Sequence, residues 1–205
     1  ISNIPINLTA ASEQKLAGLA PYFREALAKE LQEWCQEEGI DLYNDGLKIY
    51  TTIDTRMQKY AEQAVLQHMK TLQNTFDKET NRLSYIKEEP NLITKIAQQL
   101  PLYQKLSAKY NGNPDSINHH LNSTHKVKVF SYDTPSNVQE KQLSTLDSIQ
   151  YMVNCLHCSF VAIEPATGYV RAYIGDVDYN TWLYDKAQAM RQPGSTFKLF
   201  VYTEA

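Results

Sequence analysis

The sequence RQPGSTFKLF, at residues 191–200, decides how the rest of the chain is interpreted. It contains Ser195 and Lys198, and residues three apart lie on one face of a helix, so the lysine amine can reach the serine hydroxyl. A serine hydroxyl becomes an effective nucleophile when a neighbouring base takes its proton. Ser195 is therefore the candidate nucleophile and Lys198 the candidate general base, provided that the lysine is sheltered enough to be neutral for part of the cycle.

The spacing of these two residues is weak evidence by itself. The same Ser-x-x-Lys spacing occurs three more times, in what we interpret as ordinary surface pairs: Ser12–Lys15, Ser84–Lys87 and Ser123–Lys126. Pro193 and Gly194 distinguish the fourth copy, because they permit a sharp turn that places Ser195 at a helix N-terminus, where developing negative charge is favoured. We expect this helix to be buried through the apolar residues Phe197, Leu199, Phe200 and Val201.

A helix and two strands are predicted directly upstream of this motif. In SFVAIEPATGYVRAYIGD, residues 159–176, two apolar segments are joined by Pro-Ala-Thr-Gly, which suits a tight reversal between strands. STLDSIQYMVNCL, residues 144–156, predicts a helix in which Ser144 and Asp147 stand at the spacing of a capping box. Helix, strand, turn and strand in this order indicate an α/β layer.

The first part of the chain predicts two helices with a strand between them. APYFREALAKELQEWCQEEG, residues 20–39, has apolar residues at helical spacing and a stop at Gly39. NDGLKIYTTID, residues 44–54, predicts a turn and an alternating strand, and Asp54 is a candidate N-cap for the next helix, residues 55–73. The residues expected on the buried face of that helix are Met57, Tyr60, Ala61, Ala64, Val65, His68, Met69 and Leu72.

Residues 74–142 have a less regular pattern, and we expect the weakest order there. NLITKIAQQLPLYQKLSAKY, residues 91–110, predicts either one helix broken at Pro101 or two short helices. NGNPDSINHHLNSTH, residues 111–125, is interpreted as a solvated loop, so its histidines are not interpreted as metal ligands. KVKVFSY, residues 126–132, predicts a strand that could pair with residues 47–53.

Composition and cysteine spacing exclude several classes of protein. The 205 residues are 42% apolar with a formal net charge of −3, and their scattered Lys and Arg residues provide no basic surface for nucleic acid. No apolar run approaches the ~18 residues of a membrane span, so we expect any membrane anchor to lie upstream of Ile1. Cys155 and Cys158 have the spacing of a redox or metal half-site, but a zinc site would need a second ligand pair at suitable spacing, so we interpret the cysteines as packing residues. No metal or cofactor is predicted.

With these flanks, RQPGSTFKLFVY resembles the active-site serine signature of class A penicillin-binding proteins, the bifunctional enzymes that polymerise peptidoglycan strands and cross-link their peptides. LAPYFREAL resembles the segment that leaves their glycosyltransferase domain, and DGLKIYTTIDTRMQKYAEQAV resembles the linker between their two catalytic domains. LDSIQYMVNCL and VAIEPATGYVRAYIG resemble the first helix and strand pair of the transpeptidase. The resemblance covers residues 19–73 and 127–205 and is Bacteroidetes-like, whereas residues 74–126 look like a variable insertion.

The resemblance implies a fold class and a domain order. The fold class is α/β (α+β), a partial serine transpeptidase fold with helices against an incomplete antiparallel sheet, preceded by a linker of helix and strand. Residues 1–45 would be the exit of the glycosyltransferase domain and a linker helix, residues 46–143 a linker domain with an insertion at 74–126, and residues 144–205 the start of the transpeptidase.

The resemblance also assigns roles to the site residues. Ser195 would attack the D-Ala-D-Ala carbonyl and become acylated, and Lys198 would accept its proton, although the acylation base of such enzymes is disputed. A β-lactam would acylate the same serine. Two positions depart from the family pattern: Leu199 replaces the usual proline, and Asp176 stands where a second glycine is common. The Ser-x-Asn and Lys-Thr-Gly elements that complete such a site would lie beyond Ala205.

We therefore expect the full-length protein to synthesise peptidoglycan on the periplasmic side of the cell membrane. Its partners would be stem peptides, the lipid-linked precursor, β-lactams and other cell-wall synthesis proteins, and the 205-residue chain alone would be inactive. One alternative is a non-catalytic linker or scaffold module that docks envelope partners. A serine β-lactam sensor or β-lactamase is a further alternative, which the linker sequence disfavours.

Overall fold

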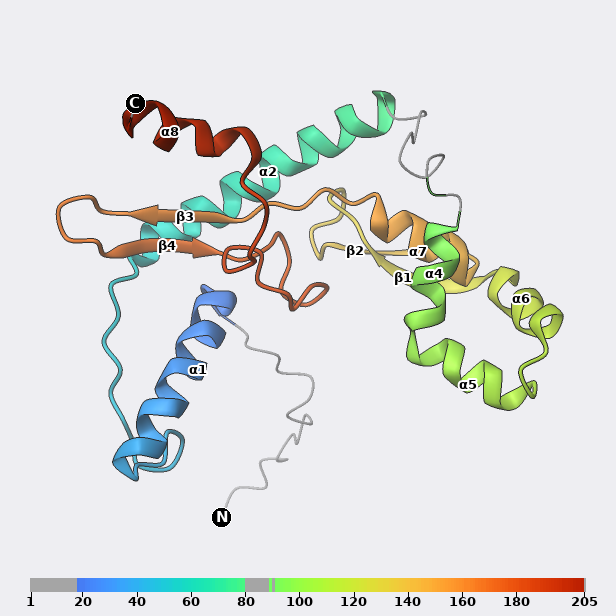
Figure 1. Ribbon diagram of the computed structural model, residues 1–205, viewed down its shortest axis with the longest axis horizontal. Helices are drawn as coiled ribbons and strands as arrows, with labels where there is room; N and C mark the ends of the chain where they lie inside the picture. The colour runs from blue at the N-terminus through green and yellow to red at the C-terminus, as the bar shows by residue number, and fades with distance from the viewer. Residues whose placement is uncertain (1–17, 80–88, 90, 205) are drawn as a thin grey trace, which may run out of the picture. The chain divides into compact units, whose positions relative to one another are not determined.

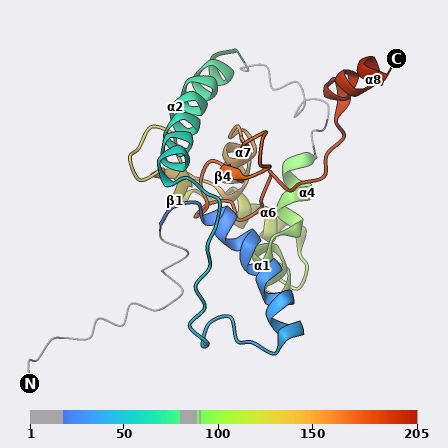
Figure 2. The same ribbon diagram turned by 90° about the vertical axis from the view of Figure 1, so that its left-hand side faces the viewer.

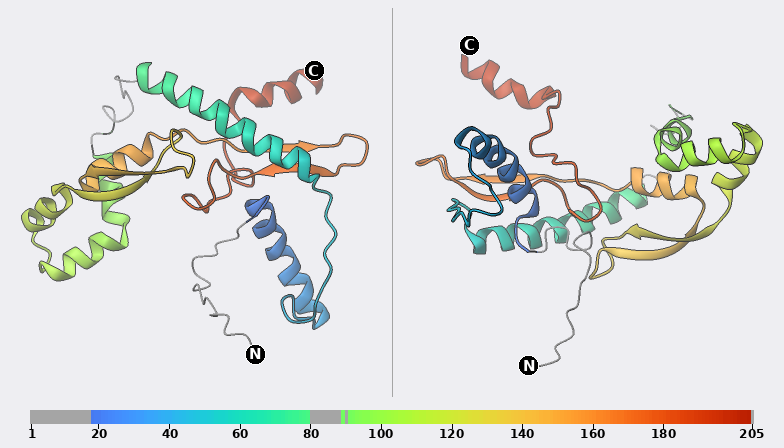
Figure 3. Two further views of the ribbon diagram at one scale, coloured as in Figure 1. Left: turned by 180° about the vertical axis from the view of Figure 1, so that it is seen from behind. Right: turned by 90° about the horizontal axis from the view of Figure 1, so that it is seen from below.

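The computed structural model describes residues 18–79, 89 and 91–204 (Figure 1). The chain divides into two compact units. Unit 1 consists of Ile1–Ala61 and Cys158–Ala205, and unit 2 consists of Glu62–His157. Within the described residues, helices are combined with two antiparallel strand pairs, which confirms the mixed α and β fold class (Figures 2 and 3). No helix in this part of the chain combines the length and apolar character needed to cross a bilayer.

Helix α1, Pro21–Glu38, begins and ends where the sequence predicts. Pro21 occupies the first helical turn, where its missing N–H leaves no helical hydrogen bond unmade. Gly39 has a φ of 69° and donates its N–H to the carbonyls at the helix end, a left-handed conformation that glycine adopts without a Cβ clash. Tyr22 and Cys35 are the buried residues of α1, whereas Trp34 is exposed.

The predicted hairpin downstream is confirmed. Strands β3, Phe160–Ile163, and β4, Val170–Ile174, pair antiparallel, with Phe160 opposite Ile174. The register shifts after Ala162, so Arg171 has no partner on β3. Ala172 and Ile174 on β4 are buried, while Phe160, Val161 and Ile163 on β3 remain exposed.

The strand predicted over residues 47–53 is not formed, and neither is its pairing with residues 126–132. Residues 47–54 instead run alongside β4 with bonds made partly by side chains. The Asp54 N–H donates to the Arg171 carbonyl at 3.0 Å, and the Thr52 hydroxyl donates to the Val170 carbonyl at 2.9 Å. The alternating pattern predicted an extended segment correctly but not a regular ladder, because these bonds do not repeat along the backbone.

Helix α2, Thr55–Glu79, extends from unit 1 into unit 2. Asp54 caps it as predicted, accepting from the N–H groups of Arg56 and Met57 at 2.8 and 3.1 Å. The predicted buried face is partly wrong: Gln58 is 1% exposed, whereas Tyr60 is 67% exposed. Both hydrogen-bonding groups of the Gln58 amide bind the backbone of Tyr173, so a polar residue takes the buried position.

The described residues of unit 2 form three short helices where the sequence pattern is irregular. Helix α4, Leu92–Gln99, ends before Pro101, and α5, Pro101–Lys109, begins there, which confirms the interpretation as two short helices. The solvated-loop interpretation of residues 111–125 is wrong, because Pro114–Asn122 form helix α6. Asn113 caps α6 by accepting from two N–H groups, and Ile117 and Leu121 are buried.

These helices enclose a small core of their own. Its fully buried members are Leu106, Ile117 and Leu121, and Tyr103, Tyr110 and Leu146 pack against them. Burial of the two apolar residues of α6 outweighs its polar composition, because the polar residues lie on its outer face. The described residues from 91 to 142 therefore carry regular structure where weak order was expected, although residues 80–88 and 90 of that region lie outside the described residues.

The rest of unit 2 is a hairpin followed by a capped helix. Strands β1, His125–Phe130, and β2, Val138–Leu143, pair antiparallel. Helix α7, Thr145–Val153, begins with the predicted capping box: the Ser144 hydroxyl accepts from the Asp147 N–H at 3.1 Å, and the Asp147 carboxylate accepts in return from the Ser144 N–H. The prediction of this helix start is confirmed to the residue.

Candidate active-site segment

Ser195 lies in the first turn of a short helical segment, as the sequence predicts. Residues Gly194–Phe197 form a 3-10 turn, η1, which continues into helix α8, Lys198–Glu204. Gly194 has a φ of 55°, in the left-handed region that favours glycine. The Lys198 N–H donates to the Ser195 carbonyl, so the candidate nucleophile and base lie one turn apart.

The two side chains are close in sequence but are not joined by a hydrogen bond in the part of the chain that the structure describes. Ser195 and Lys198 are both exposed. The segment thus has the local backbone form required by the motif, while the chemical roles of the two side chains stay predictions.

The expected burial of this helix is wrong. The side chains of its apolar residues are between 51% and 70% exposed: Phe197, Leu199, Phe200 and Val201. The Phe197 and Phe200 rings contact each other, with centroids 5.7 Å apart. Burial of an apolar face requires a second surface, and none of the described residues supplies one here.

A closed loop separates β4 from this segment. We call residues 175–188 the clamp loop. The buried carboxylate of Asp176 forms an ion pair with the Lys186 amine, and the Lys186 N–H donates to the Gly175 carbonyl at 2.9 Å. The Tyr173 hydroxyl donates to the Asp185 carboxylate at 2.6 Å. Main-chain and side-chain bonds together therefore fix the end of the clamp loop against its beginning.

Helix α1 packs against the clamp loop through aromatic residues. The Tyr22 hydroxyl donates to the Trp182 carbonyl at 2.6 Å, and the Tyr22 ring meets the Tyr179 ring edge-on at 5.0 Å. The Tyr179 hydroxyl donates to the Glu25 carboxylate at 2.7 Å. Burial, reinforced by the hydrogen bond to Glu25, raises the pKa of Tyr179 to about 12, so the phenol stays a donor.

Sequence reasoning missed the clamp loop, although one signal was present. Asp176 was noted as a departure from the family pattern, and its partner Lys186 lies ten residues later. A buried aspartate needs a compensating cation. An Asp directly after an apolar strand therefore predicts a Lys or Arg nearby.

The comparisons with known proteins show a family to which the chain is similar. A family model described as the penicillin-binding protein middle domain matches residues 73–156. Penicillin-binding protein 1A of Neisseria lactamica is 30% identical over 226 residues, covering 94% of this chain and 27% of the relative. Penicillin-binding protein 1A of Escherichia coli (strain K12) is 27% identical over 223 residues, covering 93% and 26%. Over most of its length, and at low identity, the chain is therefore similar to class A penicillin-binding proteins.

The match to penicillin-binding proteins extends beyond the segments that carried the resemblance. The middle-domain model includes residues 74–126, and its span lies within the compact unit Glu62–His157. The chain spans about a quarter of the length of the curated relatives it matches. No solved structure matches the chain. The Bacteroidetes-like character and the domain boundaries at 45 and 143 stay predictions.

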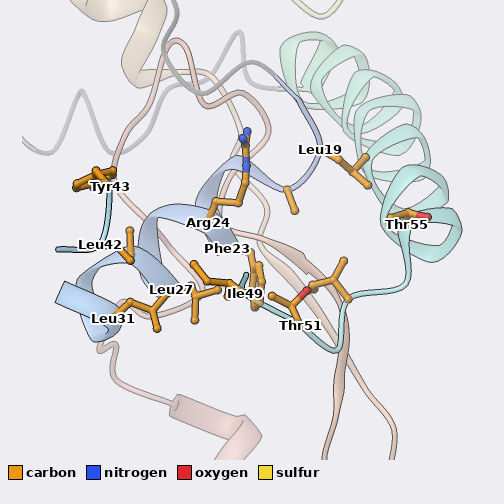
Figure 4. Close-up of a pocket in the computed structure, with 13 residues that line it drawn as sticks. Leu19, Phe23, Arg24, Leu27, Leu31, Leu42, Tyr43, Ile49, Thr51 and Thr55 are labelled. Atoms are coloured by element: carbon orange, nitrogen blue, oxygen red, sulfur yellow. The ribbon is translucent and has the colours of Figure 1, made fainter. Parts of the chain in front are cut away.

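An apolar groove lies beside α1. The groove encloses about 500 Å³ and lies between the helix and the extended segment that follows it (Figure 4). Phe23 and Leu27 of α1 line it together with Ile49 of the extended segment. The groove lies in unit 1 and includes neither Ser195 nor Lys198.

Residue types that can bind a metal, including three cysteines, occur throughout the part of the chain that the structure describes. Within the described ranges, no group of three or more His, Cys, Asp and Glu residues is placed to hold a metal ion. Cys35 and Cys155 are buried free thiols, and Cys158 is half-buried. Burial raises the pKa of the Cys155 thiol to about 11, with a further contribution from the charge of Asp77.

Proposed function

We propose that Ser195 is the acylated nucleophile of a serine transpeptidase that cross-links peptidoglycan stem peptides. The observation that carries the proposal is the position of Ser195 in the first turn after a left-handed glycine, in a chain whose relatives are named penicillin-binding protein 1A. The exposed hydroxyl also suits attack on a large external substrate.

The proposed reaction has two acyl-transfer steps. The Ser195 oxygen attacks the carbonyl carbon of the penultimate D-Ala, and its proton passes to the amine of Lys198. The peptide C–N bond then breaks, and the terminal D-Ala leaves as an amine that takes up the proton. An amine from a second stem peptide attacks the resulting ester and loses a proton, the C–O bond to Ser195 breaks, and the Ser195 oxygen takes up a proton to regenerate the hydroxyl. A β-lactam forms the same ester, but its leaving amine stays tethered to the acyl group.

The whole protein provides the remaining parts of this function. We place it at the cell membrane with its catalytic parts on the periplasmic side, where it uses stem peptides and a lipid-linked precursor and polymerises glycan strands through an upstream glycosyltransferase domain. Support comes from the relatives' names and from the collinear linker sequence. The 205-residue chain alone is expected to have no cross-linking activity, because the exposed face of α8 lacks the surface that would complete a site.

Covalent labelling of the full-length protein with a fluorescent penicillin tests the proposal. We expect one label per molecule, located on the peptide that contains Ser195 by mass spectrometry. Ser195→Ala should abolish the label, whereas Ser123→Ala, a matched change at another Ser-x-x-Lys pair, should leave it intact. Intact, folded protein that acquires no label would contradict the proposal.

A scaffold function without catalysis is the second candidate. Unit 2 favours it, because this unit has its own core and contains neither Ser195 nor Lys198. The same labelling experiment separates the two candidates, since a pure scaffold would show equal, background labelling in the wild type and in Ser195→Ala.

A further inference from the structure

A polar cavity of about 250 Å³ lies within unit 2, where α2, the end of β1 and the end of α7 meet. Its walls come from residues between positions 73 and 77, 130 and 133, and 151 and 155, all inside the span that the middle-domain model matches. Because every lining residue belongs to one compact unit, the cavity does not depend on how the two units are placed. It includes neither Ser195 nor Lys198.

Hydrogen bonds fix the walls of this cavity. The Tyr132 hydroxyl donates to the Leu156 carbonyl at 2.6 Å. The Tyr151 hydroxyl donates to the Phe130 carbonyl at 2.9 Å. The Gln73 side-chain oxygen accepts from the Leu156 N–H at 2.7 Å and so ties α2 to the chain after α7. The cavity is therefore preformed, and a ligand would spend little free energy on ordering its walls.

The free polar groups at the cavity are mainly hydrogen-bond acceptors. One oxygen of Asp77 accepts from the Gln73 side-chain amide at 2.8 Å, and one oxygen of Asp133 lies 3.0 Å from the Lys70 amine. Among the residues that the structure describes, the second oxygen of each carboxylate makes no hydrogen bond. A ligand that fits this cavity must therefore bring O–H or N–H donors.

The charges around the cavity favour a neutral ligand over an ion. The Lys70 amine already pairs with Asp133, and the Lys141 amine lies 4.1 Å from the centroid of the Tyr151 ring. An ammonium ligand would approach these two amines, whereas a phosphate would approach the free carboxylate oxygens, and like charges repel. A neutral ligand with several hydroxyl groups meets neither obstacle.

We propose that this cavity binds one sugar ring of a glycan. The ring hydroxyls donate to the free oxygens of Asp77 and Asp133, and hydrogen bonds to an ionised acceptor are the stronger kind. The C–H face of the sugar lies against the Tyr132 ring, whose orientation the bond to Leu156 fixes. The inference rests on the proposed function only for the source of the sugar, a peptidoglycan glycan strand.

Cys155 provides a reporter for the test, because its buried thiol lines the cavity. The full-length protein is treated with iodoacetamide at increasing concentrations of N-acetylglucosamine, and mass spectrometry gives the alkylation rate of each cysteine. We expect the sugar to slow alkylation of Cys155 severalfold and in a saturable manner. The rate at Cys35, which is buried in α1 of unit 1, should not change.

Two variants on α2 localise the effect. Asp77→Ala removes one charged acceptor and should raise the half-protecting sugar concentration about tenfold. Glu79→Ala removes an acidic residue of the same helix that does not line the cavity, and it should leave this concentration unchanged. Because Asp77 adds to the effect of burial on the pKa of Cys155, the quantity compared is the ratio of rates with and without sugar in each variant. Asp77→Asn, with a smaller expected loss, replaces Asp77→Ala if the latter does not fold.

Three results would overturn the proposal: an alkylation rate of Cys155 that no sugar concentration changes, equal protection in the wild type and in folded Asp77→Ala, or equal slowing at Cys35. Protection by 1,5-diaminopentane without protection by the sugar would also overturn it and would identify a cation site. Ser195→Ala should keep the protection by sugar. Failure of the proposed function has a separate signature, because the wild type would then show no penicillin label that depends on Ser195.

Discussion

Gly175 is the position where the smallest change should have a large effect on unit 1. A Cβ added there would lie 2.6 Å from the Asp185 carboxylate oxygen and 2.6 Å from two atoms of the Tyr22 ring, whereas ordinary contact begins at 3.4 Å. Neither neighbour is free to withdraw. Asp185 is held by the Tyr173 hydroxyl and the Ala187 N–H, and the hydroxyl of buried Tyr22 is bonded to Trp182.

Gly175→Ala should consequently destabilise the chain by about 2–3 kcal/mol, the upper range for overpacking a site that cannot relax. Thermal unfolding of the 205-residue chain followed by circular dichroism should show a midpoint lowered by roughly 4–12 °C. Gly168→Ala is the control: its added Cβ meets nothing within 4 Å, although its φ of +74° brings a strain of about 1 kcal/mol. If Gly175→Ala lowers the midpoint of thermal unfolding no more than Gly168→Ala does, the expected clash of the added methyl group with Tyr22 and Asp185 is refuted.

Two further predictions concern unit 2. Asn113→Ala removes the acceptor for two N–H groups of α6 and should lower the free energy of unfolding by about 1 kcal/mol in urea titrations, whereas Asn118→Ala on the exposed face of the same helix should cost much less. The folded-state pKa of Cys155 is raised from 9.0 to about 11, so folding favours the neutral thiol, and its contribution to stability is fully present below pH 9 and is lost as the pH rises toward 11. Iodoacetamide labelling read by mass spectrometry should accordingly be slow at Cys155 at pH 8 and accelerate up to pH 11; fast labelling at pH 8 in the folded chain would contradict its burial.

The sequence predicts correctly the helices whose ends are fixed by capping residues within the same few positions. The Ser144 capping box, the Asp54 cap and the Gly39 stop each bind backbone groups within a few residues, so the sequence nearby contains all the information that these boundaries need. The same holds for the turn between β3 and β4. Residues 111–125 were misinterpreted for the opposite reason, because α6 forms where Ile117 and Leu121 meet Leu106, a contact that the local composition does not reveal.

The candidate site was predictable only as a local motif. The position of Ser195 after a left-handed glycine follows from the Pro-Gly pair, and the structure has that turn. The burial of α8 was predicted from its apolar residues, but burial depends on a partner surface that the described residues do not provide. The buried face of α2 differs from the predicted one because Gln58 binds the backbone of β4. This interaction joins segments more than a hundred residues apart, so the sequence around α2 does not reveal it.

The buried ion pair also restricts how the sequence can change during evolution. Lys186 satisfies the charge of Asp176, and Gly175 leaves room for Asp185 and Tyr22 beside it, so these positions cannot vary independently. A homologue with glycine in place of Asp176 would leave the lysine without this partner and should carry a different residue at that position. We therefore expect residues 176 and 186 to change together among related sequences. If they change one at a time, the protein with only the first substitution should be less stable.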